Sequence, residues 1–140
     1  MLSARTHLLQ SKPTVLIVDD SASIRKLVDL TLRRDGYVVF SVSSGIAALA
    51  AVADQRPHLI LLDVMMDALD GFQITRALRA HPEFSDIPIV VLSGREGVND
   101  REQGYAAGVN DYLTKPFQPE QLMRVARQQL SQHVGELVVA

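Results

Sequence analysis

Three carboxylates, one hydroxyl and one ammonium each stand directly after a short apolar run of the sequence. They belong to Asp19, Asp20, Asp63, Ser93 and Lys115. If the three carboxylates meet, they repel one another, and at least one of their pKa values rises. A hard divalent cation removes this repulsion, and Mg²⁺ prefers carboxylate oxygens together with backbone carbonyls and water. Such an ion, with an ammonium and a hydroxyl beside it, suits phosphoryl transfer, in which an aspartate oxygen can itself be the nucleophile.

The apolar runs that precede these side chains have the character of buried β-strands. They are short and rich in Val and Ile, which is typical of strands covered on both faces of a parallel sheet. Between them lie stretches of helical length with an apolar stripe; Ser21 and Ser44 are predicted N-caps, and Pro119 suits the first position of the last helix. The fourth helix, at about 99–107, is weakened by glycines that include Gly104. The predicted strands are residues 15–18, 38–40, 59–62, 87–92 and, more weakly, 111–114.

Five strands that alternate with five helices indicate a doubly wound α/β domain with a parallel sheet. Right-handed connections place helices on both faces of such a sheet. Its functional crevice lies beyond the carboxyl ends of the strands. If the first, third, fourth and fifth strands are neighbours, the five polar side chains converge on one small site there.

Length and composition fit a single domain. The chain has 140 residues, of which 47% are hydrophobic, and its net charge is −2, so it lacks the basic footprint of a nucleic-acid binder. It has no cysteine, which excludes disulfides, thiolate zinc sites and cysteine nucleophiles. No apolar run approaches the length of a membrane span. We expect a soluble cytoplasmic domain at 13–132, a flexible N-terminal arm at 1–12 and a C-terminal tail at 133–140.

Four motifs together resemble the receiver domain of two-component response regulators. They are VLIVDDS at 15–21, LLDVMM at 61–66, VLSG at 91–94 and DYLTKPF at 111–117. They occur in the right order and at the ends of the predicted strands. The resemblance implies a flavodoxin-like (βα)5 fold with strand order 2-1-3-4-5.

The resemblance also implies a phosphorylation site. Asp63 corresponds to the phosphoacceptor, which receives a phosphoryl group from a histidine kinase or a phosphotransfer protein. Asp19, Asp20, Asp63 and the backbone carbonyl of Met65 correspond to the Mg²⁺ ligands, and Mn²⁺ can substitute for that ion. Such a domain catalyses only its own phosphorylation and dephosphorylation and is not an enzyme acting on other molecules.

Three further residues correspond to the parts that respond to the phosphoryl group. Ser93 occupies the position of the switch hydroxyl, Tyr112 that of the rotating aromatic, and Lys115 that of the family's lysine, whose bond to Pro116 is expected to be cis. Phosphorylation is expected to switch a surface made of the fourth helix, the fifth strand and the fifth helix. That surface would bind a downstream protein, or a second copy of the chain in a homodimer.

Two features refine this interpretation. About ten residues follow Leu130, which predicts either a stand-alone receiver of the chemotaxis or twitching-motility type or a fragment of a longer regulator. Asp67 stands where the family usually has proline, and an extra carboxylate there would perturb Mg²⁺ affinity or loosen the loop.

Three alternatives stay open from the sequence. The main one is a receiver that no longer depends on phosphorylation and acts as a binding or dimerisation module. A flavin mononucleotide carrier shares the architecture, but Asp19 and Asp20 would repel its phosphate. A phosphatase of the haloacid-dehalogenase kind needs a second Asp where this chain has Met65.

Overall fold

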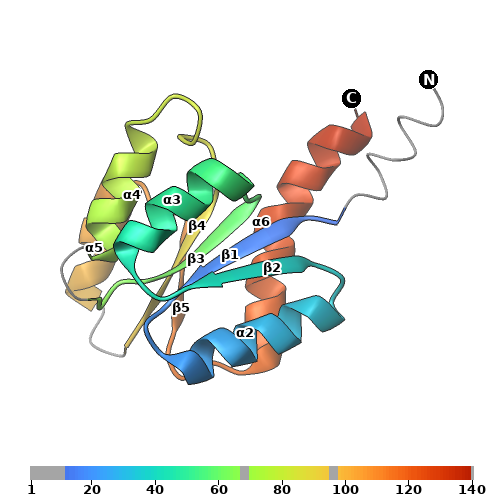
Figure 1. Cartoon of the computed structure of the whole chain (residues 1–140), viewed down its shortest axis with the longest axis horizontal. Coiled ribbons are helices and arrows are strands. Elements are labelled where there is room, and N and C mark those ends of the chain that lie inside the picture. Colours follow the sequence, from blue (N-terminus) through green and yellow to red (C-terminus); the bar gives the residue numbers. More distant parts are fainter. Residues whose placement is uncertain (1–11, 67–69, 95–97, 140) are drawn as a thin grey trace.

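A five-stranded parallel sheet forms the centre of the molecule, with helices on both faces (Figure 1). The computed structural model describes residues 12–66, 70–94 and 98–139. The strand order is β2-β1-β3-β4-β5, which confirms the predicted fold class. The elements are β1 (Thr14–Val18), α2 (Ala22–Arg34), β2 (Val38–Val42), α3 (Gly45–Gln55), β3 (Leu59–Asp63), α4 (Gly71–Arg79), β4 (Ile89–Ser93), α5 (Val98–Ala107), β5 (Asp111–Thr114) and α6 (Pro119–Val139).

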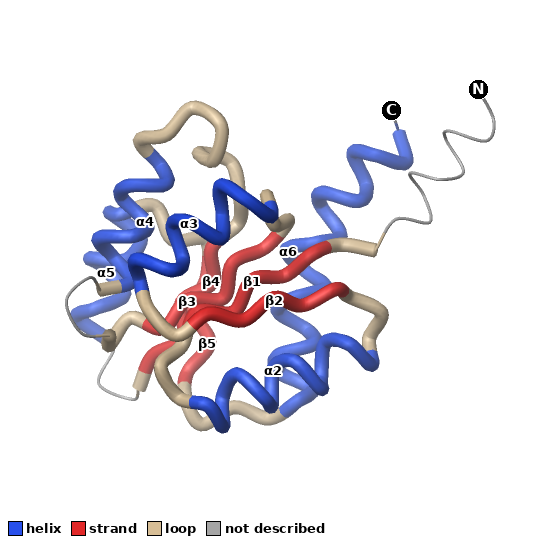
Figure 2. Tube along the Cα trace, in the orientation of Figure 1, coloured by secondary structure: helices blue, strands red, loops and turns tan. Residues whose placement is uncertain are grey.

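Alternation along the strands divides the core between the two faces. On β1, Val15 and Ile17 join the core cluster that contains residues of α2 and α6. Leu16 and Val18, which point the other way, join the cluster beneath α3 and α4. Figure 2 shows these helices on opposite sides of the strands. Since β1 and β3 are buried on both faces, they are continuously apolar, as the sequence predicts for central parallel strands.

The helix starts follow from local capping. Ser21 accepts a hydrogen bond from the Ile24 amide and Ser44 one from the Ala47 amide, which confirms both predicted N-caps. The sequence analysis did not identify the cap of α4. There Asp70 and Gln73 form a capping box, so α4 begins immediately after the Asp70 side chain.

The predicted strand boundaries differ from the observed ones by at most two residues. For example, β4 begins at Ile89 rather than at residue 87, because Pro88 has no N–H to donate to the ladder. At the carboxyl end of the described residues, α6 continues to Val139. No helix in the described ranges is both long and apolar enough to span a membrane.

Arg79 joins three segments at the amino-terminal edge of the sheet. From the last turn of α4, its guanidinium donates to the carbonyls of Gly108, Ser85 and Ile87 at 2.8 to 3.0 Å, and to Asn110 Oδ1 at 2.7 Å. These acceptors lie in the α5–β5 connection and in the segment that leads to β4. One side chain therefore fixes the end of the sheet opposite the carboxyl ends of the strands.

Replacing Arg79 by Ala should lower the free energy of unfolding by about 2 to 4 kcal/mol, because four acceptors lose a charged donor. Urea unfolding followed by circular dichroism measures this loss. Arg76→Ala is the matched control, since Arg76 is an exposed residue of the same helix. Equal stability of the two variants would contradict the assigned role of Arg79.

Candidate functional site at the carboxyl edge of the sheet

Four neighbouring strands bring the predicted site residues to one edge of the sheet. Asp19 and Asp20 follow β1, Asp63 ends β3, Ser93 ends β4, and Lys115 follows β5. These strands are parallel and adjacent in the order β1-β3-β4-β5, so their carboxyl ends lie side by side. The predicted juxtaposition of the first, third, fourth and fifth strands is confirmed.

An ammonium lies between two buried carboxylates. Lys115 Nζ is 2.7 Å from Asp19 Oδ2 and 3.4 Å from Asp63 Oδ1. Asp19 is completely buried and Asp63 is 3% exposed, whereas the Lys115 side chain retains some contact with solvent. Two negative charges that would otherwise repel each other in a region of low dielectric therefore share one cation.

Backbone hydrogen bonds hold both carboxylates in place. The Ser21 amide donates to Asp19 Oδ1 at 2.9 Å, and the Met65 amide donates to Asp63 Oδ1 at 3.1 Å. Arg25 of α2 donates to the Asp19 carbonyl at 2.7 Å. The acids are thus fixed by the first residues of the loops that follow their own strands, before any ligand binds.

The charge balance at Asp63 is incomplete. Burial raises the pKa of the Asp63 carboxyl above its usual value, and the negative charge of Asp19 raises it further. The Met65 amide and the Lys115 ammonium act in the opposite direction, but the net pKa shift is upward. One cation for two buried acids leaves residual negative potential at this edge.

The acidic side chains form a suitable donor set for a divalent cation. Asp19, Asp20 and Asp63 each offer a carboxylate oxygen, and these oxygens lie within 4.8 Å of one another. Asp20 is exposed, so the cluster opens to solvent on its side. Hard oxygen ligands with room for water match the preference of Mg²⁺, and the incomplete charge balance at Asp63 favours a cation.

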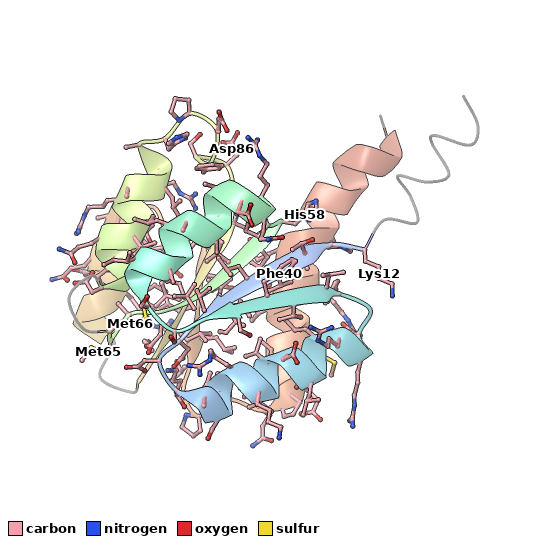
Figure 3. The ribbon with its side chains drawn as sticks, viewed as in Figure 1. Lys12, Phe40, His58, Met65, Met66 and Asp86 are labelled. Carbon is pink, nitrogen blue, oxygen red and sulfur yellow. The ribbon has the colours of Figure 1, made fainter. Side chains whose placement is uncertain are left out.

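Met65 contacts the acidic cluster through its backbone. Its amide bonds to Asp63, while its side chain is 74% exposed and packs on nothing in the core. Figure 3 shows Met65 and Met66 at the end of the molecule opposite Lys12 and His58. The Met65 backbone therefore lies beside the acidic cluster, where a carbonyl ligand is expected from the sequence.

Ser93 is at the end of β4 and is almost completely buried. It pairs with Thr114 of β5, and its carbonyl accepts a hydrogen bond from the Lys115 amide at 2.6 Å. Among the described residues, its hydroxyl makes a single long contact, 3.4 Å, to the Gly94 carbonyl. A hydroxyl held so loosely beside Lys115 can turn toward a new acceptor.

Tyr112 lies within β5 and is not one of the side chains at the carboxyl edge of the sheet. It pairs with Val91 of β4, two residues before the pair that Ser93 forms, and is 6% exposed. Its ring belongs to a core cluster between β4, β5 and the helices α4 and α5. The other members of this cluster are Val64, Phe72, Val91, Ala107 and Val109.

Sequence reasoning missed the roles of two residues. Arg25 was not predicted to contact the site, but it donates to the Asp19 carbonyl. Gly71 was not predicted to matter there either, yet a Cβ at this position would be 2.8 Å from the Asp63 carbonyl oxygen. Glycine therefore lets α4 start directly against the backbone of the acid. Asp67, the predicted departure from the family pattern, lies outside the described residues.

The chain belongs to the response regulator receiver domain family, which matches residues 15–127. Protein PilG of Pseudomonas aeruginosa is 37% identical over 109 residues, which are 78% of this chain and 81% of PilG. The chain spans 44% to 48% of the length of other curated relatives, among them transcriptional regulators. The family predicted from the four motifs is confirmed.

Solved structures agree in fold. The chemotaxis response regulator CheY4 of Vibrio cholerae superposes with a TM-score of 0.81 at 34% identity, covering 85% of this chain and 99% of CheY4. The receiver domain of the sensor histidine kinase PA1611 from Pseudomonas aeruginosa has a TM-score of 0.79 at 34% identity, covering 86% and 99%. The PA1611 structure carries a magnesium ion coordinated in its active-site cleft.

Replacing Asp63 by Asn should raise the melting temperature of the metal-free protein at pH 7 by a few degrees, the shift that about 1 kcal/mol produces in a domain of this size. The change removes a buried charge beside Asp19 but keeps an oxygen for the Met65 amide. A carboxyl whose pKa is raised by folding destabilises the fold when ionised. This penalty falls as the pH drops through the raised pKa, and it is gone below the unfolded value of 3.8.

Scanning calorimetry in EDTA from pH 7 down to pH 3.8 tests this prediction, with the exposed Asp86→Asn as control. The advantage of the Asp63→Asn variant over the wild type should shrink toward acid pH. A constant advantage, or one that grows on acidification, would contradict the assigned charge balance.

Proposed function

We propose that the chain is a phosphoryl-accepting receiver of a two-component system, with Asp63 as the phosphoacceptor. The observation that carries the proposal is the position of Lys115 Nζ, 2.7 Å from Asp19 and 3.4 Å from Asp63, in a cluster of three acids. The donor would be a histidine kinase or a phosphotransfer protein of the cytoplasm. In the transfer, a bond forms between an Asp63 oxygen and phosphorus while the bond from phosphorus to the donor's imidazole nitrogen breaks.

Asp19, Asp20, Asp63 and the Met65 carbonyl would hold Mg²⁺ in this reaction. The ion would supply positive charge for the phosphoryl oxygens and the acids together. The oxygen donor set of this chain and the magnesium ion in the related PA1611 receiver support the assignment. Manganese, with similar ligand preferences, would serve in its place.

The other site residues would stabilise the phosphorylated state. Lys115, already drawn to Asp63, would offer its ammonium to a phosphoryl oxygen, and the loosely bonded Ser93 hydroxyl would donate to another. Each new bond would pull on β4 or β5, and Tyr112 of β5 packs with Val91 of β4 and Ala107 of α5. The fourth helix, fifth strand and fifth helix of the sequence analysis are α5, β5 and α6. Their surface would then bind a downstream protein rather than nucleic acid.

The similarity to PilG, of which the chain covers 81%, supports a receiver of the chemotaxis or twitching-motility type. In such a role the switched surface is itself the output, either as a monomer that binds a partner or as a homodimer formed through that surface. A receiver that works without phosphorylation would keep the surface and lose the labelling chemistry.

The wild-type protein should gain one phosphoryl group from acetyl phosphate in Mg²⁺, detected by intact-protein mass spectrometry. Asp63→Asn should not be labelled, because the attacking oxygen is gone. Asp86→Asn changes an exposed acid in the segment that leads to β4, at the opposite edge of the sheet, and should be labelled like the wild type. Persistent labelling of Asp63→Asn, or an unlabelled wild type, would refute the phosphoacceptor assignment.

Mg²⁺ should raise the melting temperature, because an ion that binds only the folded protein stabilises it by roughly 1.4 kcal/mol at ten times its dissociation constant. Asp20→Asn should reduce this Mg²⁺-dependent shift by more than half, since it removes one of three acidic ligands at an exposed position. Thermal unfolding in Mg²⁺ and in EDTA measures the effect, with Asp86→Asn as control. An unchanged shift in Asp20→Asn would place the ion elsewhere.

A further inference from the structure

One face of α5 encloses the ring of Tyr112. Arg101, Gly104 and Tyr105 have the spacing i, i+3, i+4, so they share a side of the helix. The Arg101 guanidinium carbon is 5.2 Å from the centre of the Tyr112 ring, and the Tyr105 ring is tilted against it at 5.3 Å between centroids. Arg101 also donates to Thr114 Oγ1 at 3.2 Å, so α5 is tied to β5 on both sides of the ring.

Gly104 provides the space that the head of this ring occupies. A Cβ at position 104 would be 1.6 Å from Tyr112 Oη, 2.6 Å from Tyr112 Cζ and 3.0 Å from Phe72 Cε1. Gly104 is helical and has no positive φ, so the backbone does not require glycine there. Glycine weakens the interior of a helix relative to alanine. Glycine at position 104 therefore destabilises α5, but any larger residue at this position would displace Tyr112.

The enclosed ring is connected to the phosphorylation site through β5. Tyr112 lies three residues before Lys115, which directly follows the strand. The Lys115 amide is bonded to the Ser93 carbonyl and its ammonium to Asp19. A displacement of Tyr112 and a displacement of Lys115 therefore act on the same short stretch of backbone.

We propose that Gly104 is a positioning residue of the switch. By leaving room for Tyr112 in the core, it favours the packing of α5 on β5 that accepts the phosphoryl group. It thereby determines which surface, including the half-exposed Tyr105, a partner meets. The regulatory meaning rests on the proposed function, whereas the steric relation between Gly104 and Tyr112 does not.

The experiment compares Gly104→Ala in two backgrounds, wild type and Tyr112→Ala. In the wild type the new methyl group collides with the ring, so the melting temperature should fall. In Tyr112→Ala the ring is absent and only the 3.0 Å approach to Phe72 remains, so the same substitution should lower the melting temperature much less. Gln103→Ala, an exposed change on the same helix, should have the same effect in both backgrounds. If Gly104→Ala lowers the melting temperature equally in both backgrounds, the proposal fails.

A second readout separates positioning from mere stability. NMR of ¹³C-labelled tyrosine, assigned by Phe substitution of the three tyrosines, reports the exposure of Tyr112 to a soluble paramagnetic agent. The Tyr112 signal should become exposed in Gly104→Ala and stay protected in Gln103→Ala. If Gly104→Ala does not fold, recovery of folding by Tyr112→Ala supports the proposal and its absence overturns it.

The regulatory half is tested by titrating beryllofluoride, a mimic of the phosphoryl group, in Mg²⁺. Gly104→Ala should bind it several-fold more weakly, because the conformation with Tyr112 in the core becomes less populated. Unchanged affinity would overturn the assigned effect on the switch. Absence of binding and labelling in the wild type would instead refute the proposed function, and the thermal comparison would still decide the steric relation.

Discussion

The structure of the site depends on one cation shared by two buried acids. Lys115 comes from the end of the last strand, Asp19 from the loop after the first, and Asp63 from the end of the third. Without the ammonium, two carboxylates would lie in a region of low dielectric with only amide donors to compensate them. With it, one of the two negative charges remains uncompensated, as the raised pKa of the Asp63 carboxyl indicates. This residual negative charge favours the binding of a divalent cation.

The topology of the sheet makes this convergence possible, and its two edges have different roles. At the amino-terminal edge Arg79 satisfies four acceptors from two connections, which fixes α4 relative to β4 and β5. At the carboxyl edge the acids are also held by hydrogen bonds, but within the described residues the Ser93 hydroxyl makes a single long hydrogen bond and Asp20 is open to solvent. Hydrogen-bonding capacity is left available at the edge where a ligand would bind.

The fold and the positions of the acidic residues could be predicted because both depend on which residues are neighbours in the sequence. Continuous apolar runs predict central strands, and Asp63 follows one of them directly, so its position at the sheet edge needs no knowledge of distant contacts. The roles of Gly71, Gly104 and Arg25 could not be predicted in this way. Gly104 is eight residues from Tyr112 in sequence, and only the packing of α5 on β5 reveals that a Cβ would strike the ring. From the sequence alone, a glycine at this position predicts only a less stable helix.

Two residues that lower the stability of the fold, Asp63 and Gly104, are connected through neighbouring residues of the same segment. Asp63 retains a charge that burial disfavours, and Gly104 weakens the helix that it belongs to. Asp63 contacts Lys115, which directly follows β5, and Gly104 contacts Tyr112 within β5, so the two contacted residues are three positions apart on one stretch of chain. A sequence selected for stability alone would have an amide at the first position and alanine at the second, with a smaller side chain in place of the Tyr112 ring. Departures from local consistency that are linked in this way are typical of a site under functional constraint. This linkage is why we assign Gly104 to the switch rather than to the fold.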